Sequence, residues 1–182
     1  MKTESTVKYV LRLTVTLLLI TAVVAVILAG VNSVTAPRIA DLNARKTQEA
    51  VEAVLPGGGV EVAFTDSTGL VATVYQGEAG YAVKVNPSGF NGTVSMMVGV
   101  DNNGSVLGIS IISQTETAGL GAVSAADTSA GEAFRGQFAG MSGSVSVSKD
   151  GGQVDAITGA TITSRAVCTG VNAALACVAN MG

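Results

Sequence analysis

Hydrophobic positions are distributed unevenly along the chain, and the longest uninterrupted apolar run lies near the N-terminus. Residues 13–31 carry no charge. As a helix, such a run is long enough to cross a hydrocarbon core, which takes about 20 residues. Three bases and one acid precede the run: Lys2, Lys8, Arg12 and Glu4. The positive-inside bias therefore predicts a single-pass anchor with a cytoplasmic N-terminus and the following domain on the extracytoplasmic side of the cell membrane.

A cleaved signal peptide is the alternative interpretation of this run. Its apolar region would be unusually long, and Pro37 directly after Ala36 disfavours cleavage there. No cysteine directly follows the run, so a lipid anchor is not indicated. We therefore predict that residues 1–36 form the cytoplasmic N-terminus and an uncleaved, membrane-embedded anchor.

A second helical pattern follows the anchor. Apolar residues recur at helical spacing across residues 37–55, with charged residues between them. Pro56 and the three glycines after it end the pattern. The prediction is an amphipathic stalk helix with its linker, residues 37–59, which either continues the membrane helix or kinks away from it.

From residue 60 the hydrophobic period shifts towards two, which indicates short strands. The candidate strands are residues 60–64, 70–76, 80–85, 93–100 and 106–113. Asp101, two asparagines and Gly104 lie between the last two and predict a hairpin turn. Beyond them the pattern predicts a helix at 131–138, short strands at 145–148 and 154–157, and a last helix from Ser164 towards Asn180.

Composition narrows the chemistry. The chain has 182 residues, of which 48% are hydrophobic and 4% aromatic, with no His, no Trp and two Cys. The absence of His excludes His-ligated haem and disfavours a zinc or copper site of the usual kind. Two cysteines cannot hold an ordinary iron–sulfur cluster. An electron carrier of this composition would need an organic cofactor. Residues 37–182 are acidic on balance, which argues against nucleic acid as a partner.

The two cysteines lie in the predicted last helix. Cys168 and Cys177 project from opposite faces and are about 13.5 Å apart along the axis. This separation is beyond the reach of a disulfide. We expect both to be free and buried as small apolar residues.

Residues 154–164 carry the strongest chemical signal. A glycine and a run of hydroxyl side chains stand directly before the pattern of the last helix. A helix that begins here directs free N–H groups and a positive dipole end at this turn, which suits an anion. A plain N-cap by Thr163 or Ser164, with nothing bound, is the alternative on local grounds.

This segment resembles a known motif. It matches the pattern Asp-x-x-(Ser/Thr)-Gly-Ala-Thr of the FMN-binding domain family at Asp155, Thr158, Gly159, Ala160 and Thr161, with Thr163 following. The family includes the G subunit of the Rnf complex and the C subunit of the sodium-translocating NADH:quinone reductase. The resemblance implies covalent FMN, joined through its phosphate to the Thr161 hydroxyl. It also implies that Thr158, Gly159, Ala160 and Thr163 belong to the FMN site.

A second segment, residues 115–121, resembles the family's Glu-Thr-Pro-Gly-Leu-Gly loop, with Ala118 in the place of proline. In the family this loop lies near the flavin. The resemblance implies cofactor contacts from Glu116, Thr117, Gly119, Leu120 and Gly121. A Gly-rich turn that closes a strand is the alternative. The two motifs occur in the family's order, which makes the pair more specific than either alone.

Pattern and resemblance together predict an α+β chain. A transmembrane helix and a stalk helix precede an FMN-binding domain of antiparallel strands packed with helices, residues 60–182. The resemblance implies a flavoprotein subunit that relays electrons in an Rnf-type ferredoxin:NAD oxidoreductase coupled to ion movement. Its partners would be the other membrane and peripheral subunits, with a flavin transferase for maturation. The chain is not expected to catalyse a net reaction alone. The alternatives are a stand-alone anchored flavoprotein in extracellular electron transfer and a cofactor-free anchored binding module.

Overall fold

The computed structural model of the chain describes the backbone of residues 2–181 and the side chains of residues 7–181. The chain divides into two compact units, Met1–Ala44 and Arg45–Gly182. The side chains of Lys2 and Glu4, on which the predicted topology partly rests, lie outside the described residues.

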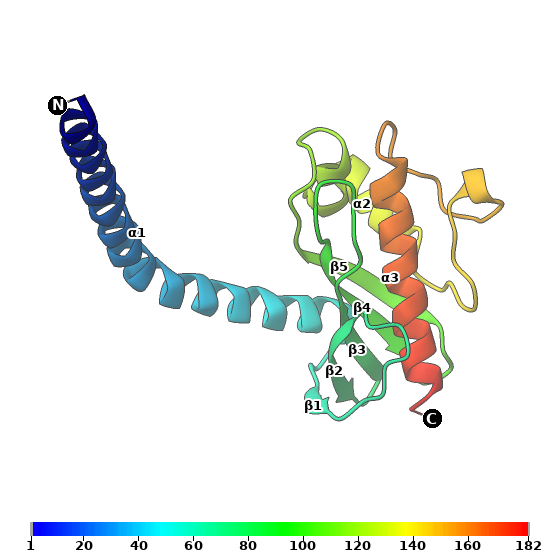
Figure 1. Cartoon of the computed structure of the whole chain (residues 1–182). Helices are drawn as coiled ribbons and strands as arrows, with labels where there is room; N and C mark the ends of the chain where they lie inside the picture. The colour runs from blue at the N-terminus through cyan, green and yellow to red at the C-terminus, as the bar shows by residue number, and fades with distance from the viewer. Residues whose placement is uncertain (1, 182) are drawn as a thin grey trace. The chain divides into compact units, whose positions relative to one another are not determined.

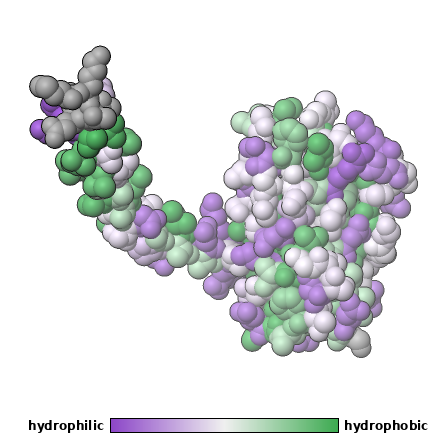
Figure 2. Space-filling view, viewed as in Figure 1, coloured by the Kyte–Doolittle hydropathy of each residue, from purple (hydrophilic) through white to green (hydrophobic). Residues whose placement is uncertain are grey.

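The first helix, α1, comprises Lys2–Val54 and is assigned as one helix through Pro37 (Figure 1). The stalk pattern therefore continues the apolar helix. Large apolar side chains are exposed along the first unit, among them Leu17, Leu18 and Ile27, and Figure 2 shows this apolar surface on the N-terminal part of α1. The helix is long and apolar enough to cross a membrane. A helix that is apolar on its exposed sides is stable where lipid surrounds it, which supports membrane association.

Five antiparallel strands form one sheet in the second unit, and each strand pairs with the next along the chain. Their bounds are β1 Val60–Val62, β2 Val71–Gly77, β3 Gly80–Val85, β4 Ser95–Asp101 and β5 Val106–Ser113. β3 and β5 begin and end as predicted, and the others differ by one or two residues at one end or at both. The predicted hairpin turn joins β4 to β5. There the Asp101 carboxylate accepts hydrogen bonds from the N–H groups of Asn103 (2.9 Å) and Ser105 (2.8 Å).

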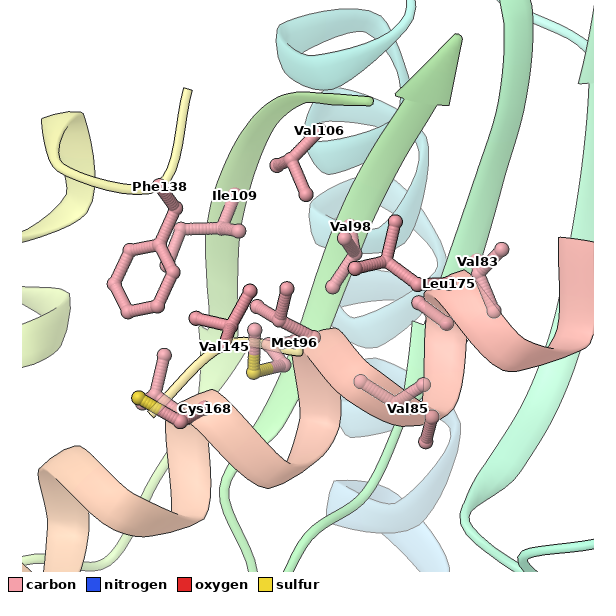
Figure 3. Close-up of a cluster of buried hydrophobic side chains, with 14 of the residues drawn as sticks. Val83, Val85, Met96, Val98, Val106, Ile109, Phe138, Val145, Cys168 and Leu175 are labelled. Carbon is pink, nitrogen blue, oxygen red and sulfur yellow. The ribbon is translucent and has the colours of Figure 1, made fainter. Parts of the chain in front are cut away.

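Apolar layers cover both faces of the sheet, which confirms the α+β class. Successive side chains of β4 point to opposite faces of the sheet and so enter different cores. Met96 and Val98 belong to the core under the last helix, α3 (Thr161–Ala179), whereas Met97 belongs to the core on the other face. Figure 3 shows part of the first core between α3 and the strands. The second core is completed by the end of α1, through Ala50, Val51 and Val54, and by Leu55 directly after it. The stalk pattern thus ends as part of the domain that carries the sheet.

α3 is a core helix. It also has the length and composition of a membrane span, but most of its residues are buried in the domain. Both of its cysteines are buried and free, as predicted. Burial raises the pKa of the Cys168 thiol to about 11. This thiol is therefore protonated and unreactive at neutral pH.

Two short helices follow β5: the 3₁₀-helix η1, Gly121–Ala125, and α2, Ser129–Gly136. α2 corresponds to the helix predicted at 131–138 but begins two residues earlier. The reason is local, because the Thr128 hydroxyl accepts a hydrogen bond from the Gly131 N–H (3.3 Å) and caps the first turn.

The two strands predicted at residues 145–148 and 154–157 are wrong. Val147 and Val154 form one isolated parallel bridge, and a 3₁₀-helix, η2 (Ser148–Asp150), follows the first of them. The segment folds back on itself within a few residues, with the Ser148 N–H bonded to the Val154 carbonyl at 2.8 Å. Both valines are fully buried, so their apolar pattern reflects core packing rather than strand pairing.

Candidate functional site

The two sequence motifs meet at one cavity of about 330 Å³. Its lining comes from four separate segments and consists of Phe90, Glu116, Thr117, Leu120, Gly121, Lys149, Gly159, Ala160, Thr161, Ile162 and Thr163. Hollows of about 760 and 650 Å³ lie elsewhere on the domain and are lined by neither motif. A third hollow, of about 600 Å³, is lined by Gly119 of one motif and by Asp155 and Thr158 of the other, but not by Thr161. The volume of the shared cavity falls at the lower end of the range for small-molecule sites, roughly 300–1,000 Å³.

Glu116 joins three of these segments. Its side chain is buried, and its carboxylate accepts hydrogen bonds from the backbone N–H groups of Asn91 (2.9 Å) and Phe90 (3.3 Å). The Thr163 hydroxyl donates a further short hydrogen bond to it. The loop between β3 and β4, the loop after β5 and the first turn of α3 are therefore fixed to one another through a single carboxylate.

The pKa of Glu116 lies below its ordinary value. Burial raises it, but the hydrogen bonds from Thr163, Asn91 and Phe90 together lower it by more. Glu116 is consequently ionised at neutral pH and contributes a fixed negative charge to the cavity wall.

Two glycines allow the motifs to approach closely. Gly159 has a φ of 77°, in the left-handed region, and a Cβ there would lie 2.9 Å from Cδ2 of Leu120. A Cβ on Gly121 would lie 2.7 Å from Oε2 of Glu116 and would also meet the Thr163 hydroxyl. Glycine at both positions therefore serves the contact between the two motifs, which the sequence alone did not reveal.

The first turn of α3 has no side-chain cap. The helix begins at Thr161, three residues before the predicted start, and Ala160 occupies the N-cap position without a capping hydrogen bond. The alternative of a plain N-cap by Thr163 or Ser164 is therefore wrong. Thr163 donates to Glu116, and the Ser164 hydroxyl donates to the Ala160 carbonyl and accepts from the Ile157 N–H, both at 3.0 Å. The first turn of α3 lines the cavity, and no side-chain oxygen caps its N–H groups. The Glu116 carboxylate lies beside this turn but is bonded to the Thr163 hydroxyl.

Thr161 is half-buried and lines the cavity. Nζ of Lys149 donates a hydrogen bond to its Oγ1 at 3.3 Å. Lys149 belongs to η2, and the next residue, Asp150, accepts two hydrogen bonds from Arg165 at 2.7 and 2.6 Å. Sequence reasoning missed Lys149, because a lysine in a Lys-Asp-Gly-Gly turn has the pattern of any solvated loop.

Apolar side chains form another part of the wall. Leu120 and Ile162 line the cavity although they are 42% and 49% exposed, and Phe90 lines it while 68% exposed. Phe90 was also missed from the sequence. The sequence offers only a weak signal for it, a single aromatic residue between Gly89 and Asn91-Gly92 in a loop.

The structure brings together all but two of the predicted site residues. Thr158 and Gly119 do not line this cavity but line an adjacent hollow beside α2. The other predicted residues line the cavity: Glu116, Thr117, Leu120, Gly121, Gly159, Ala160, Thr161 and Thr163.

The arrangement suits a ligand with an anionic end and a flat apolar end. A hydroxyl, an ammonium and an uncapped helix terminus lie together at Thr161, and apolar side chains lie beside them. This combination defines a domain able to bind a phosphorylated cofactor such as FMN.

Comparison with known proteins agrees with this description. The model of the FMN-binding domain family matches residues 89–176. The chain is 32% identical to the G subunit of the ion-translocating oxidoreductase complex of Methanosarcina acetivorans, over 92% of this chain and 94% of that protein. It is 34% identical to the G subunit of the Na⁺-translocating ferredoxin:NAD⁺ oxidoreductase complex of Acetobacterium woodii, over 96% and 94%. A proton-translocating counterpart from Clostridium ljungdahlii is 39% identical over 52% and 51%.

Residues 89–176 thus form an FMN-binding domain by sequence similarity. The chain belongs to the family formed by the G subunits of ion-translocating oxidoreductase complexes.

Proposed function

We propose that this chain is a membrane-anchored flavoprotein subunit of an Rnf-type, ion-translocating ferredoxin:NAD oxidoreductase complex. FMN is joined to Thr161 by a phosphodiester and serves as one relay for electrons. The observation that carries the proposal is the meeting of both motifs at one cavity beside the Thr161 hydroxyl. The relatives named as subunits of ferredoxin:NAD⁺ oxidoreductases support the assignment to a complex.

FMN, once bound, supplies the capacity to take up and release electrons. The chain's own residues bind and orient it. Thr161 holds the phosphate end at the start of α3, where the helix dipole stabilises an anion by roughly 0.3–1 kcal/mol. Leu120 offers apolar contact for the ring or the ribityl chain, and Thr117 offers polar contact. Glu116 holds three parts of the cavity lining together, because its carboxylate bonds to the loop between β3 and β4 and to the first turn of α3.

The other subunits of the complex are the proposed partners, since the chain by itself would neither receive electrons from ferredoxin nor deliver them to NAD. A flavin transferase is needed to make the Thr161 linkage. We place the domain formed by residues 60–182 on the extracytoplasmic side of the cell membrane, as residues 1–36 predict.

The test is the intact mass of the purified full chain, together with its visible absorption spectrum, after expression with a flavin transferase. We expect the mass increment of one attached FMN and a flavin absorption spectrum that remains with the protein after denaturation. A colourless protein of unmodified mass would instead indicate a cofactor-free binding module. A flavinylated protein that is never recovered with other membrane subunits from its host would indicate a stand-alone flavoprotein.

The predicted topology has its own measurement. Protease added outside sealed spheroplasts should digest the domain that follows α1, because Lys8 and Arg12 hold the N-terminus in the cytoplasm. Protease added to inverted vesicles should leave that domain intact, which serves as the control. Full protection in spheroplasts, with digestion in inverted vesicles, would show the opposite orientation.

A further inference from the structure

Lys149 is the one cationic side chain among the described residues that line the cavity. Neither motif includes it, and its Nζ lies 3.3 Å from Oγ1 of Thr161. A neutral hydroxyl satisfies one of the three donors of an ammonium and leaves its charge without a counterion.

The carboxylates near Lys149 are engaged elsewhere. Asp150, its neighbour in η2, is paired with Arg165 through two hydrogen bonds. Glu116, which also lines the cavity, accepts hydrogen bonds from Phe90, Asn91 and Thr163. Within the part of the chain that the structure describes, no salt bridge includes Lys149.

An ion pair holds η2, the segment that carries the exposed Lys149, against α3. Arg165 lies one helical turn after Thr161 in α3, and its guanidinium donates two hydrogen bonds to the Asp150 carboxylate, at 2.7 and 2.6 Å. A two-point Arg–carboxylate pair fixes orientation as well as distance. The pair holds η2 against α3. Because Asp150 is paired with Arg165, it does not serve as the counterion of Lys149, and the Lys149 ammonium beside Thr161 can pair with another anion.

We propose that Lys149 is a phosphate-binding residue whose ammonium pairs with the anion of the phosphodiester at Thr161. This inference rests on the proposed function and deepens it by naming the side chain that neutralises the tethered phosphate. Asp150 and Arg165 act as positioning residues, because they hold η2 against the turn that carries Thr161. The phosphodiester oxygens replace the Thr161 hydroxyl as the principal partner of the ammonium.

The test compares flavinylated and unflavinylated full-length protein, the latter made without flavin transferase. Attachment of FMN should raise the Tm of the wild type by about 2–4 °C through the new ion pair, and high salt should weaken this gain. K149Q should lose most of the gain, whereas K149R should keep it. K46Q is the matched control, because it removes an exposed lysine of the same unit away from the cavity.

The ³¹P NMR resonance of the attached phosphodiester provides a second measurement that a purely structural role would not change. We expect the resonance to shift in K149Q but not in K46Q. Loss of attachment in K149Q with its restoration in K149R would also support the role of the charge. If the wild type is flavinylated and K149Q keeps the same gain in Tm, the same salt dependence and the same resonance, the assignment of Lys149 is overturned while the proposed function stands. Absence of covalent FMN from the wild type would overturn both.

Discussion

Replacement of Thr161 by alanine should abolish covalent flavin attachment while leaving the domain folded. The Thr161 hydroxyl is the proposed site of the phosphodiester, and alanine has no oxygen to carry it. The side chain is only partly buried and its hydroxyl contacts the exposed Lys149, so we expect the free energy of unfolding to differ from that of unflavinylated wild type by about 0.5 kcal/mol or less. In-gel flavin fluorescence and intact mass measure the attachment, and circular dichroism measures the fold.

The structure supplies two controls for this prediction. Thr158→Ala removes a hydroxyl from the same motif outside the cavity and should keep full attachment. Thr163→Ala should also keep the flavin, but it should lower stability because the hydroxyl is buried and donates to Glu116. Flavin fluorescence and the FMN mass increment in the Thr161 variant would show that another residue carries the linkage.

Much of the fold could be predicted because its signals are local. The period-two pattern and the Asn-Gly turn fixed β5 and the hairpin before it, and the uncharged run identified the apolar part of α1. The prediction of short strands at 145–148 and 154–157 was wrong, because alternating valines occur in buried core segments as well as in paired strands. Val147 and Val154 do so through a single bridge.

Only the site residues that belong to the two motifs could be predicted from the sequence. Resemblance identified Thr161 and the loop at 116–121, and the structure brings them to one cavity. It could not show that Glu116 fastens three segments, because hydrogen bonds to Asn91 and Thr163 depend on tertiary contact. The start of α3 was misplaced for the same reason. Hydroxyls that look like N-caps in sequence are used for contacts away from the cap.

Replacement of Glu116 by glutamine should destabilise the domain by about 2 kcal/mol at neutral pH. Glutamine keeps one acceptor oxygen but directs an NH₂ group at donors that the carboxylate now satisfies, and a buried donor left without an acceptor costs about 1–3 kcal/mol. The partners are the N–H groups of Phe90 and Asn91 and the Thr163 hydroxyl. Urea unfolding of wild type and variant, with flavin present in both, measures the difference. Glu78→Gln is the matched control, because Glu78 is exposed at a turn of the same domain.

The stability difference between wild type and Glu116→Gln should depend on pH with a definite sign. The folded pKa of Glu116 is lowered from its ordinary 4.5, because the hydrogen bonds outweigh burial. The ionised carboxylate therefore adds stability above that ordinary value, and this contribution is lost as the pH falls through the folded pKa. The difference should be largest near pH 7 and shrink below 4.5. A difference independent of pH between about 7 and 3 would show that the charge of Glu116 has no part in holding the loops together.

The same substitution should change the flavin. A fixed negative charge in the cavity wall opposes the negative charge that reduction adds to the ring, by Coulomb repulsion in a site partly shielded from water. Glu116→Gln, with FMN still attached, should therefore raise the midpoint potential and alter the visible spectrum, whereas Glu78→Gln should change neither. A destabilised variant with an unchanged potential and spectrum would place Glu116 in the support of the cavity but away from the ring. The two measurements thus separate the structural role of this carboxylate from its electrostatic one.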